Sequence, residues 1–153
     1  MIQRKTFLLV GLAACFTTMS AFAQEHGSKD EAKAMVEKAI EHVKKVGPDQ
    51  AWKDFSTSKD WKSKDLYVIA FDMKANMLAH GANEKLIGKN HMEMKDAAGK
   101  PMTAEMVKLV ATAGSGWVDY EWPNPVSKKI ESKSTYAKKL PTFDGFVGVG
   151  VYR

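Results

Sequence analysis

The sequence predicts an α+β domain in which helices precede an antiparallel sheet. Between residues 29 and 57, apolar side chains recur every three or four positions, which is the period of an amphipathic helix. From residue 65 onward, short runs of β-branched and aromatic residues are separated by turn residues. One further helical segment lies among these runs. Strands grouped in this way, without a helix after each one, favour an antiparallel sheet.

A long helix is expected to begin after Ser28, whose hydroxyl can cap it, with acidic residues in the first turn. Its apolar stripe consists of Ala32, Met35, Val36, Ala39, Ile40, Val43 and Val46. Gly47 and Pro48 end this helix, and Pro48 can begin a second, shorter one. The second helix carries Ala51, Trp52 and Phe55. A third helix is predicted over 103–110.

Five strands are predicted, over residues 66–71, 77–80, 117–122, 129–138 and 146–152. The first two form a hairpin. The stretch 81–101, which is punctuated by glycine and proline, is predicted to be rich in loops. In the last strand, Gly148 and Gly150 leave one face without side chains.

Alternation divides the third strand into two faces, because successive side chains of a strand point in opposite directions. Trp117, Asp119 and Glu121 share one face. Val118, Tyr120 and Trp122 share the other, which we predict to be the wall of a pocket. Tyrosine and tryptophan suit such a wall because each offers apolar area together with a hydrogen-bond donor.

The N-terminus has the features of a secretory signal peptide. The basic residues Arg4 and Lys5 precede an apolar run, and a small-x-small site ends at Ala23. The apolar run is too short for a stable membrane anchor. We therefore predict a signal peptide over 1–23 and a mature domain over 24–153, located in the periplasm or secreted.

Cys15 leaves a second reading of the N-terminus open. Residues 12–15, Leu-Ala-Ala-Cys, resemble a bacterial lipobox, in which the cysteine would be lipidated. If the chain is instead cleaved after residue 23, the mature protein has no cysteine, because Cys15 is the one cysteine of the sequence. It would then contain no disulfide and no reactive thiol.

Composition excludes several classes of function. The net charge of +5 is mild and dispersed, so we expect no binding of nucleic acid. After the N-terminal run, no segment is long and apolar enough to predict a transmembrane helix. The 153 residues suffice for one domain with a modest core.

Seven short segments together carry a resemblance to a known family. In order they read DLYVIAFD (65–72), LAH (78–80), LIGKN (86–90), DAAG (96–99), GWVDYEWP (116–123), KSTY (133–136) and FVGVGVY (146–152). Their order and spacing resemble the single Cache domains of type 2. These are PAS-like extracytoplasmic sensor domains of bacterial chemoreceptors and sensor kinases.

The resemblance implies a long N-terminal helix packed on a five-stranded antiparallel sheet. It also implies a pocket between the sheet and the loop-rich segment, with a small organic acid as the typical ligand. Membrane-bound members carry transmembrane helices on both sides of the sensor. Because none is predicted here, we expect a stand-alone form that presents its ligand to a membrane chemoreceptor or sensor kinase.

The candidate ligand-binding residues are Tyr67, His80, Tyr120, Trp122, Lys133 and Tyr136. Resemblance to family pocket positions points to Tyr120, Trp122 and Tyr136. Lys133, with Lys128 and Lys129 as alternatives, can supply the cation that a buried carboxylate requires. His80 can bind a carboxylate, and Tyr67 can reach the pocket from its strand. For each of these residues, packing in the core or solvation at the surface is the competing interpretation.

Metal binding and catalysis find little support in the sequence. The four histidines show no zinc-binding spacing, and the methionines are scattered, so we interpret the latter as core residues and expect neither a metal site nor a cofactor. Cleavage after Ala23 would place His26 third from a free amine, an arrangement that can chelate Cu(II) or Ni(II). No catalytic motif is present, and we expect no enzymatic activity.

The function predicted from the sequence is therefore that of a sensor domain that binds a small organic acid. The alternative is a periplasmic protein–protein interaction module with no small ligand. A pocket filled by the domain's own side chains would favour this alternative.

Overall fold

The helices form where the periodicity predicts them. The structure is a computed structural model that describes residues 25–153, so the predicted signal peptide and Cys15 lie outside the described residues. The helices are α1 (Lys29–Val46), α2 (Pro48–Thr57) and α3 (Met102–Ala113), with 3-10 turns at Lys59–Trp61 and Glu84–Leu86. A capping box begins α1: Glu31 N donates to Ser28 Oγ at 3.2 Å, and Ser28 N donates to Glu31 Oε2 at 2.7 Å. Within residues 25–153, no helix is both long and apolar enough to span a bilayer.

The strands form one antiparallel sheet. They are β1 (Lys62–Ser63), β2 (Leu66–Asp72), β3 (Met77–His80), β4 (Ser115–Pro123), β5 (Ile130–Lys139) and β6 (Gly145–Tyr152). The order is β1-β2-β6-β5-β4, and β3 pairs with β2. The described residues thus contain six strands rather than the predicted five. The additional strand β1 has two residues, too few to show any periodicity in the sequence.

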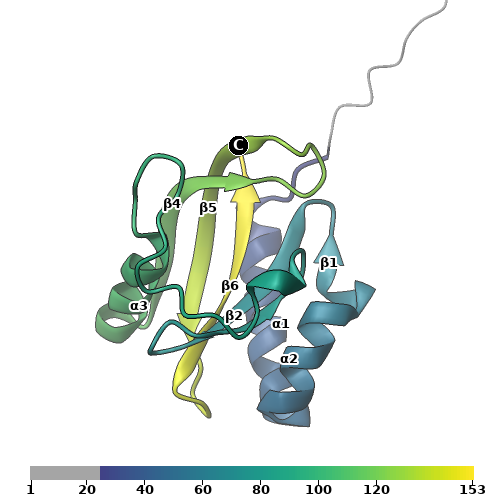
Figure 1. Ribbon diagram of the computed structural model, residues 1–153. Helices are drawn as coiled ribbons and strands as arrows, with labels where there is room; N and C mark the ends of the chain where they lie inside the picture. The colour runs from purple at the N-terminus through teal and green to yellow at the C-terminus, as the bar shows by residue number, and fades with distance from the viewer. Residues whose placement is uncertain (1–24) are drawn as a thin grey trace, which may run out of the picture.

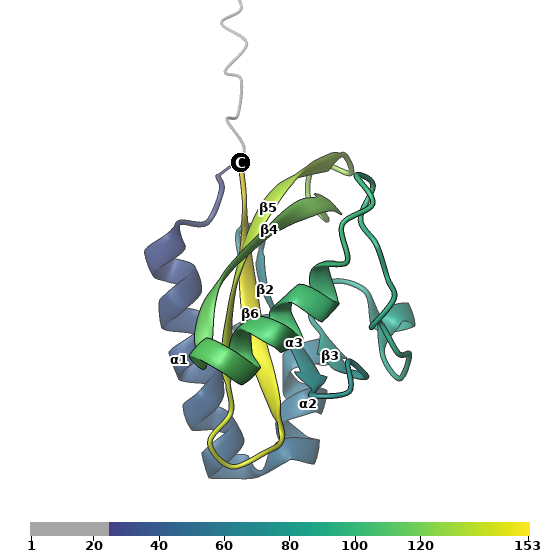
Figure 2. The same ribbon diagram turned by 90° about the vertical axis from the view of Figure 1, so that its left-hand side faces the viewer.

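The sheet separates two cores, as Figures 1 and 2 show. Helices α1 and α2 cover one face, where they pack against β2, β3, β5 and β6. Helix α3 packs on the other face, against β4 and β5. Strand β6 serves both cores, because Val147, Val149 and Val151 point to α1 and α2, whereas Phe146 and Tyr152 point to the α3 side. The predicted helix-and-sheet architecture is confirmed.

Strand β4 has the two faces that alternation predicts. Val118, Tyr120 and Trp122 belong to the core on the α3 side. Trp117 packs against the core on the α1 side instead. Asp119, on the same face as Trp117, is exposed. The aromatic residues of this strand therefore pack into two different cores, one on each face of the sheet.

The loop-rich segment 81–101 is fastened to the outer edge of β4. Asp96 accepts a hydrogen bond from the backbone N of Glu121 at 2.9 Å, and Lys100 Nζ donates to the carbonyl oxygen of Asp119 at 2.5 Å. These side chains satisfy backbone groups that an edge strand would otherwise expose. Because the segment is held at this edge, it closes over the face of the sheet beside α3.

Candidate functional site

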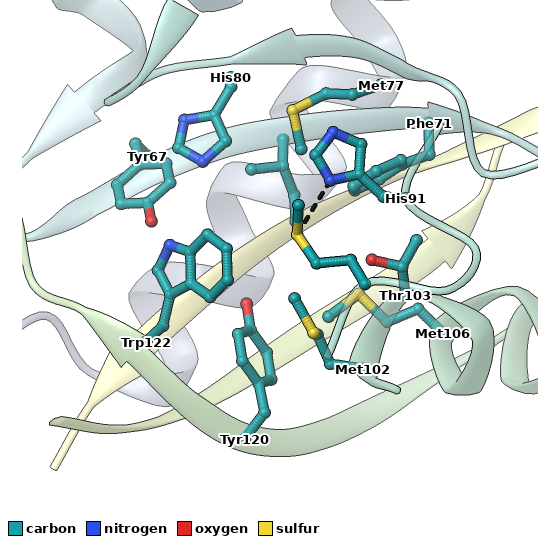
Figure 3. Close-up of a pocket in the computed structure, with 12 residues that line it drawn as sticks. Tyr67, Phe71, Met77, His80, His91, Met102, Thr103, Met106, Tyr120 and Trp122 are labelled. Atoms are coloured by element: carbon teal, nitrogen blue, oxygen red, sulfur yellow. Dashed lines mark hydrogen bonds between the residues drawn. The ribbon is translucent and has the colours of Figure 1, made fainter. Parts of the chain in front are cut away.

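A small cavity lies between the sheet, α3 and the loop segment 81–101 (Figure 3). Its lining is made of Tyr67, Ile69, Phe71, Met77, His80, His91, Met94, Met102, Thr103, Met106, Tyr120 and Trp122. The enclosed volume is about 20 Å³, which is room for roughly one water molecule. The lining includes four of the six residues that the sequence predicts for the ligand site: Tyr67, His80, Tyr120 and Trp122. We call this space the inner cavity.

Lys133 lies beside the inner cavity, behind Tyr67, and is 2% exposed. Its Nζ donates to the hydroxyl of Tyr67 at 2.7 Å and to that of Tyr152 at 3.2 Å. It also lies over both rings, 4.0 Å from the centroid of Tyr67 and 4.5 Å from that of Tyr152. The Tyr152 hydroxyl in turn donates to the carbonyl oxygen of Pro123 at 2.9 Å. A buried network therefore joins β2, β4, β5 and β6.

Gly150 explains why a lysine can lie flat across this face. Strand β5 pairs with β6 so that Thr135 faces Gly150 and Lys133 faces Tyr152. A Cβ atom at position 150 would overlap the Lys133 side chain at Cε. The space that Gly150 leaves bare on β6 is thus the place through which the Lys133 side chain passes.

Burial sets the charge state of Lys133. Desolvation lowers its pKa to about 7, and Asp65 opposes this shift by a weaker Coulombic attraction. No carboxylate of residues 25–153 forms a salt bridge with Lys133. When protonated, Lys133 is therefore a buried cation that only the weak attraction of Asp65 offsets, and an anionic ligand can stabilise it further.

His80 offers a hydrogen-bond donor to the same region. Its Nδ1 accepts the backbone N–H groups of Ala82 at 3.1 Å and Asn83 at 2.9 Å, so in the neutral ring Nε2 carries the proton. Burial, with smaller repulsion from Lys133, lowers the pKa of His80 to about 3, which keeps the imidazole neutral at physiological pH. Its ring lies 4.9 Å from that of Tyr67. His80 can thus donate through Nε2 to a ligand.

Tyr120 and Trp122 form the wall of the inner cavity on β4. The hydroxyl of Tyr120 lies 2.9 Å from Thr135 Oγ1, and burial raises the pKa of Tyr120 far above its usual value. The ring of Trp122 lies edge-on to that of Tyr120, at 6.1 Å between centroids. The indole nitrogen of Trp122 faces the Tyr67 hydroxyl (Figure 3). The wall is therefore apolar, and of its polar atoms the indole nitrogen of Trp122 faces the Lys133 network, whereas the Tyr120 hydroxyl contacts Thr135.

A larger hollow lies outside the inner cavity and shares three of its walls. This outer hollow has a volume of about 280 Å³ and is lined by Tyr67, His80, Ala82, Asn83, Trp122, Pro123, Asn124, Pro125 and Lys128. Tyr67, His80 and Trp122 line both spaces. These three side chains therefore form the partition between the outer hollow and the inner cavity.

Tyr136 does not lie with the other candidates. It pairs with Trp117 across β4 and β5, and its ring lies 5.3 Å from that of Trp117 on the α1 side of the sheet. Lys33 of α1 sits 5.5 Å above its ring. The reason is the two-residue period of a strand: Lys133 and Tyr136 are three positions apart on β5 and must point to opposite faces.

Several residues near the site were not among the predicted ligand-binding residues. Tyr152 joins the Lys133 network, and His91 and Met94 line the inner cavity. The partners of Tyr152 depend on the register between β5 and β6, which leaves no local trace in the sequence.

Among residues 25–153, no three His, Cys, Asp or Glu side chains are grouped as a metal site. His26 is held by Asp65, with 2.6 Å between Nδ1 and Oδ2, so a chelating role for His26 would have to displace this contact.

A match to a family model shows to which PAS-like family this chain belongs. The model described as Single Cache domain 2 matches residues 8–153. The chain belongs to the single Cache domain 2 family. The match begins within the predicted signal peptide, whose cleavage remains a prediction. Membership makes this chain a sensor domain of the kind found in chemoreceptors and sensor kinases.

Two curated relatives are membrane-signalling proteins of which this chain matches a small part. The sensor histidine kinase MctS of Rhizobium johnstonii is 31% identical over 96 residues, which are 63% of this chain and 20% of the kinase. The methyl-accepting chemotaxis protein McpP of Pseudomonas putida is 31% identical over 88 residues, which are 58% of this chain and 16% of McpP.

Solved structures share the fold. A methyl-accepting chemotaxis protein from Vibrio parahaemolyticus superposes with a TM-score of 0.72 at 23% identity, over 81% of this chain and 87% of that one. A Cache chemosensory domain, solved to explain its recognition of carboxylic acids, has a TM-score of 0.69 at 26% identity, over 80% and 91% of the two chains. The Cache fold predicted for this sequence is therefore confirmed.

Proposed function

We propose that this Cache domain senses a small organic acid whose carboxylate is bound by Lys133, Tyr67 and His80. The observation that carries the proposal is the buried side-chain nitrogen of Lys133, which forms no salt bridge with a carboxylate among residues 25–153. A carboxylate placed against it would gain a charge-assisted hydrogen bond and offset the desolvation of the lysine. The carboxylic acid recognised by a related Cache domain supports the same ligand class.

Binding of an acid requires the partition between the two spaces to open. The inner cavity of about 20 Å³ is too small for an acid with several carbon atoms. Trp122 lines both the inner cavity and the outer hollow, and it is only partly buried. Displacement of its indole would join the two spaces and uncover the Tyr67 hydroxyl. The ligand therefore enters from the outer hollow and leaves its apolar end among the methionines.

The proposed output is a change in shape that a membrane protein reads. Chemoreceptors and sensor kinases are the relatives of this domain, so one of these is the proposed partner. We place the domain in the periplasm or outside the cell, after cleavage at residue 23. No reaction is proposed for this site.

Isothermal titration calorimetry with acetate, propionate, pyruvate, lactate and amino acids tests this function. At least one acid should bind with millimolar or tighter affinity to the wild type and show no binding to Lys133→Met, which keeps the side-chain volume and removes the charge. Lys129→Met is the matched control, since Lys129 is exposed in the same hairpin. Unchanged affinity of the Lys133→Met variant would exclude the proposed carboxylate site.

The two faces of β4 supply a second test. Tyr120→Ala and Trp122→Ala should weaken acid binding by about tenfold or more, because both side chains line the inner cavity. Asp119→Ala and Glu121→Ala should have little effect, since their side chains point to the opposite face. Equal losses from both faces would contradict the assignment of the pocket wall.

An interaction module without a small ligand is the second candidate. The small volume of the inner cavity favours it, because the domain's own side chains nearly fill the space. The exposed apolar side chains of Val126 and Ile130, near the turn between β4 and β5, would then be part of the binding surface. This candidate predicts that none of the acids binds and that Val126→Asp removes the binding of a receptor's extracytoplasmic domain.

A further inference from the structure

The inner cavity is lined by soft donor atoms. Four of its lining residues are methionines, Met77, Met94, Met102 and Met106, and the imidazole of His91 lies with them. Thioethers are neutral, polarisable ligands that prefer Cu(I) and similar soft cations. None of the described residues that line the cavity carries a carboxylate or a thiol. The donor set therefore suits a soft monovalent ion and gives Mg²⁺, Ca²⁺ or Zn²⁺ little to bind.

Three separate segments bring these donors together. His91 and Met94 belong to one turn, in which Met94 N donates to the carbonyl oxygen of His91 at 3.1 Å. Met102 and Met106 are four residues apart on α3 and thus lie on the same side of that helix. Figure 3 shows both of their side chains reaching into the cavity from α3, and its dashed line marks the contact between His91 and Met94.

The imidazole of His91 is arranged as a metal ligand would be. It is 1% exposed, and its Nε2 lies 2.9 Å from the carbonyl oxygen of Leu86. A carbonyl oxygen can only accept, so Nε2 carries the proton, and in the neutral ring Nδ1 is a bare lone pair. A backbone carbonyl that orients the other ring nitrogen in this way is typical of metal-bound histidines.

The bare Nδ1 of His91 meets another acceptor rather than a donor. Its neighbour is Met94 Sδ, at 3.0 Å, and a thioether sulfur has no proton to donate. In the neutral ring two lone pairs therefore face each other in a buried site, which is unfavourable unless the two atoms share a proton or a metal cation. The two atoms point at each other, and a modest movement of Met94 Sδ away from Nδ1 would admit one ion.

We propose that the inner cavity binds one Cu(I) ion through His91 Nδ1 and Met94 Sδ, with the sulfur atoms of Met102 and Met106 completing the site. The cavity volume of about 20 Å³ suits a single ion, with Met94 Sδ moving away from His91 Nδ1 to admit it. This site uses other polar atoms than the proposed organic acid, whose carboxylate is held by Lys133, Tyr67 and His80, although the ion and the apolar end of the acid would compete for the space among the methionines. The site selects a soft metal ion because its donor atoms are polarisable sulfurs, and it does not rely on charged side chains.

Silver(I), a soft ion that does not change oxidation state here, allows the site to be tested by NMR. The protein is labelled with [methyl-¹³C]methionine and carries Cys15→Ser, so that no thiol competes. One equivalent of Ag(I) should shift the methyl signals of Met94, Met102 and Met106. The signals of Met35 and Met92 should stay in place, since neither lines the cavity. Equal shifts at all methionines, or none, would overturn the proposal.

Competition between the protein and a colorimetric Cu(I) chelator under anaerobic conditions then measures affinity. Met94→Leu should weaken binding by about tenfold or more, and the double variant Met102→Leu/Met106→Leu should do the same, because leucine keeps the volume without the sulfur. Met92→Leu is the matched control from the same loop and should bind as the wild type does.

Binding of Cu(I) and of organic acids can fail independently. Lys133→Met should keep its affinity for Cu(I), even though it loses the acid. If Met94→Leu binds Cu(I) as tightly as the wild type, the cavity is not the site. The contact between His91 and Met94 would then be an ordinary N–H···S hydrogen bond.

Discussion

At the scale of single residues, Lys133 depends on the absence of a side chain at Gly150. A methyl group at position 150 would occupy the place of Lys133 Cε and also crowd Thr135 Oγ1. Gly150→Ala should therefore displace the lysine from the hydroxyls of Tyr67 and Tyr152, lower stability by about 1–3 kcal/mol and abolish acid binding. Chemical denaturation and calorimetry measure the two effects. Gly47→Ala, between α1 and α2, is the comparison: no atom lies within 4 Å of the added methyl group, so this variant should strain the backbone, whose φ is +84°, and leave binding intact.

At the scale of elements, Asp96 determines how the segment 81–101 attaches to β4. Its carboxylate accepts backbone N–H groups of Glu121 at 2.9 Å, Lys100 at 2.7 Å and Ala98 at 2.9 Å, and these bonds lower its pKa. Asp96→Ala should cost about 2–3 kcal/mol, because it leaves several backbone donors without a partner. Hydrogen exchange should then become faster at Glu121. Protection at Glu121 that equals the wild type's would show that the loop is held by other contacts.

At the scale of the whole molecule, stability and acid binding should respond to pH in opposite directions. The folded-state pKa of Lys133, about 7, lies below its ordinary value of 10.5. Between these values the unfolded chain binds more protons than the folded one, so stability rises with pH, by about 2 kcal/mol from pH 7 to 9. Over the same range the ammonium is lost, and the affinity for an organic acid should fall roughly 50-fold.

Urea denaturation and calorimetry at pH 7, 8 and 9 measure these two slopes. The Lys133→Met variant is the control, because without the titrating amine its stability should change much less over this range. If the free energy of unfolding of the wild type does not change from pH 7 to 9, the side chain of Lys133 does not become a neutral amine in the folded state over this range.

Local patterns predict most of the fold and part of the site. The bounds of α1 and α2, and the two faces of β4, depend on residues close together in the chain, and periodicity reveals such residues directly. The two-residue period of a strand, applied to β5, puts Lys133 and Tyr136 on opposite faces. The sequence alone therefore predicts that these two residues cannot line one pocket. The two-residue strand β1 has no period and could not be detected.

What the sequence by itself determined is the order of the elements and the direction in which most side chains point. Only the tertiary structure decided which elements lie side by side. Strand β6 pairs with both β2 and β5, which brings Lys133 to Tyr67, 66 positions away. The methionines that look scattered along the chain meet in one cavity for the same reason. Side-chain direction follows from the local backbone period, whereas strand order is selected by the burial of whole faces against one another, which no short segment encodes.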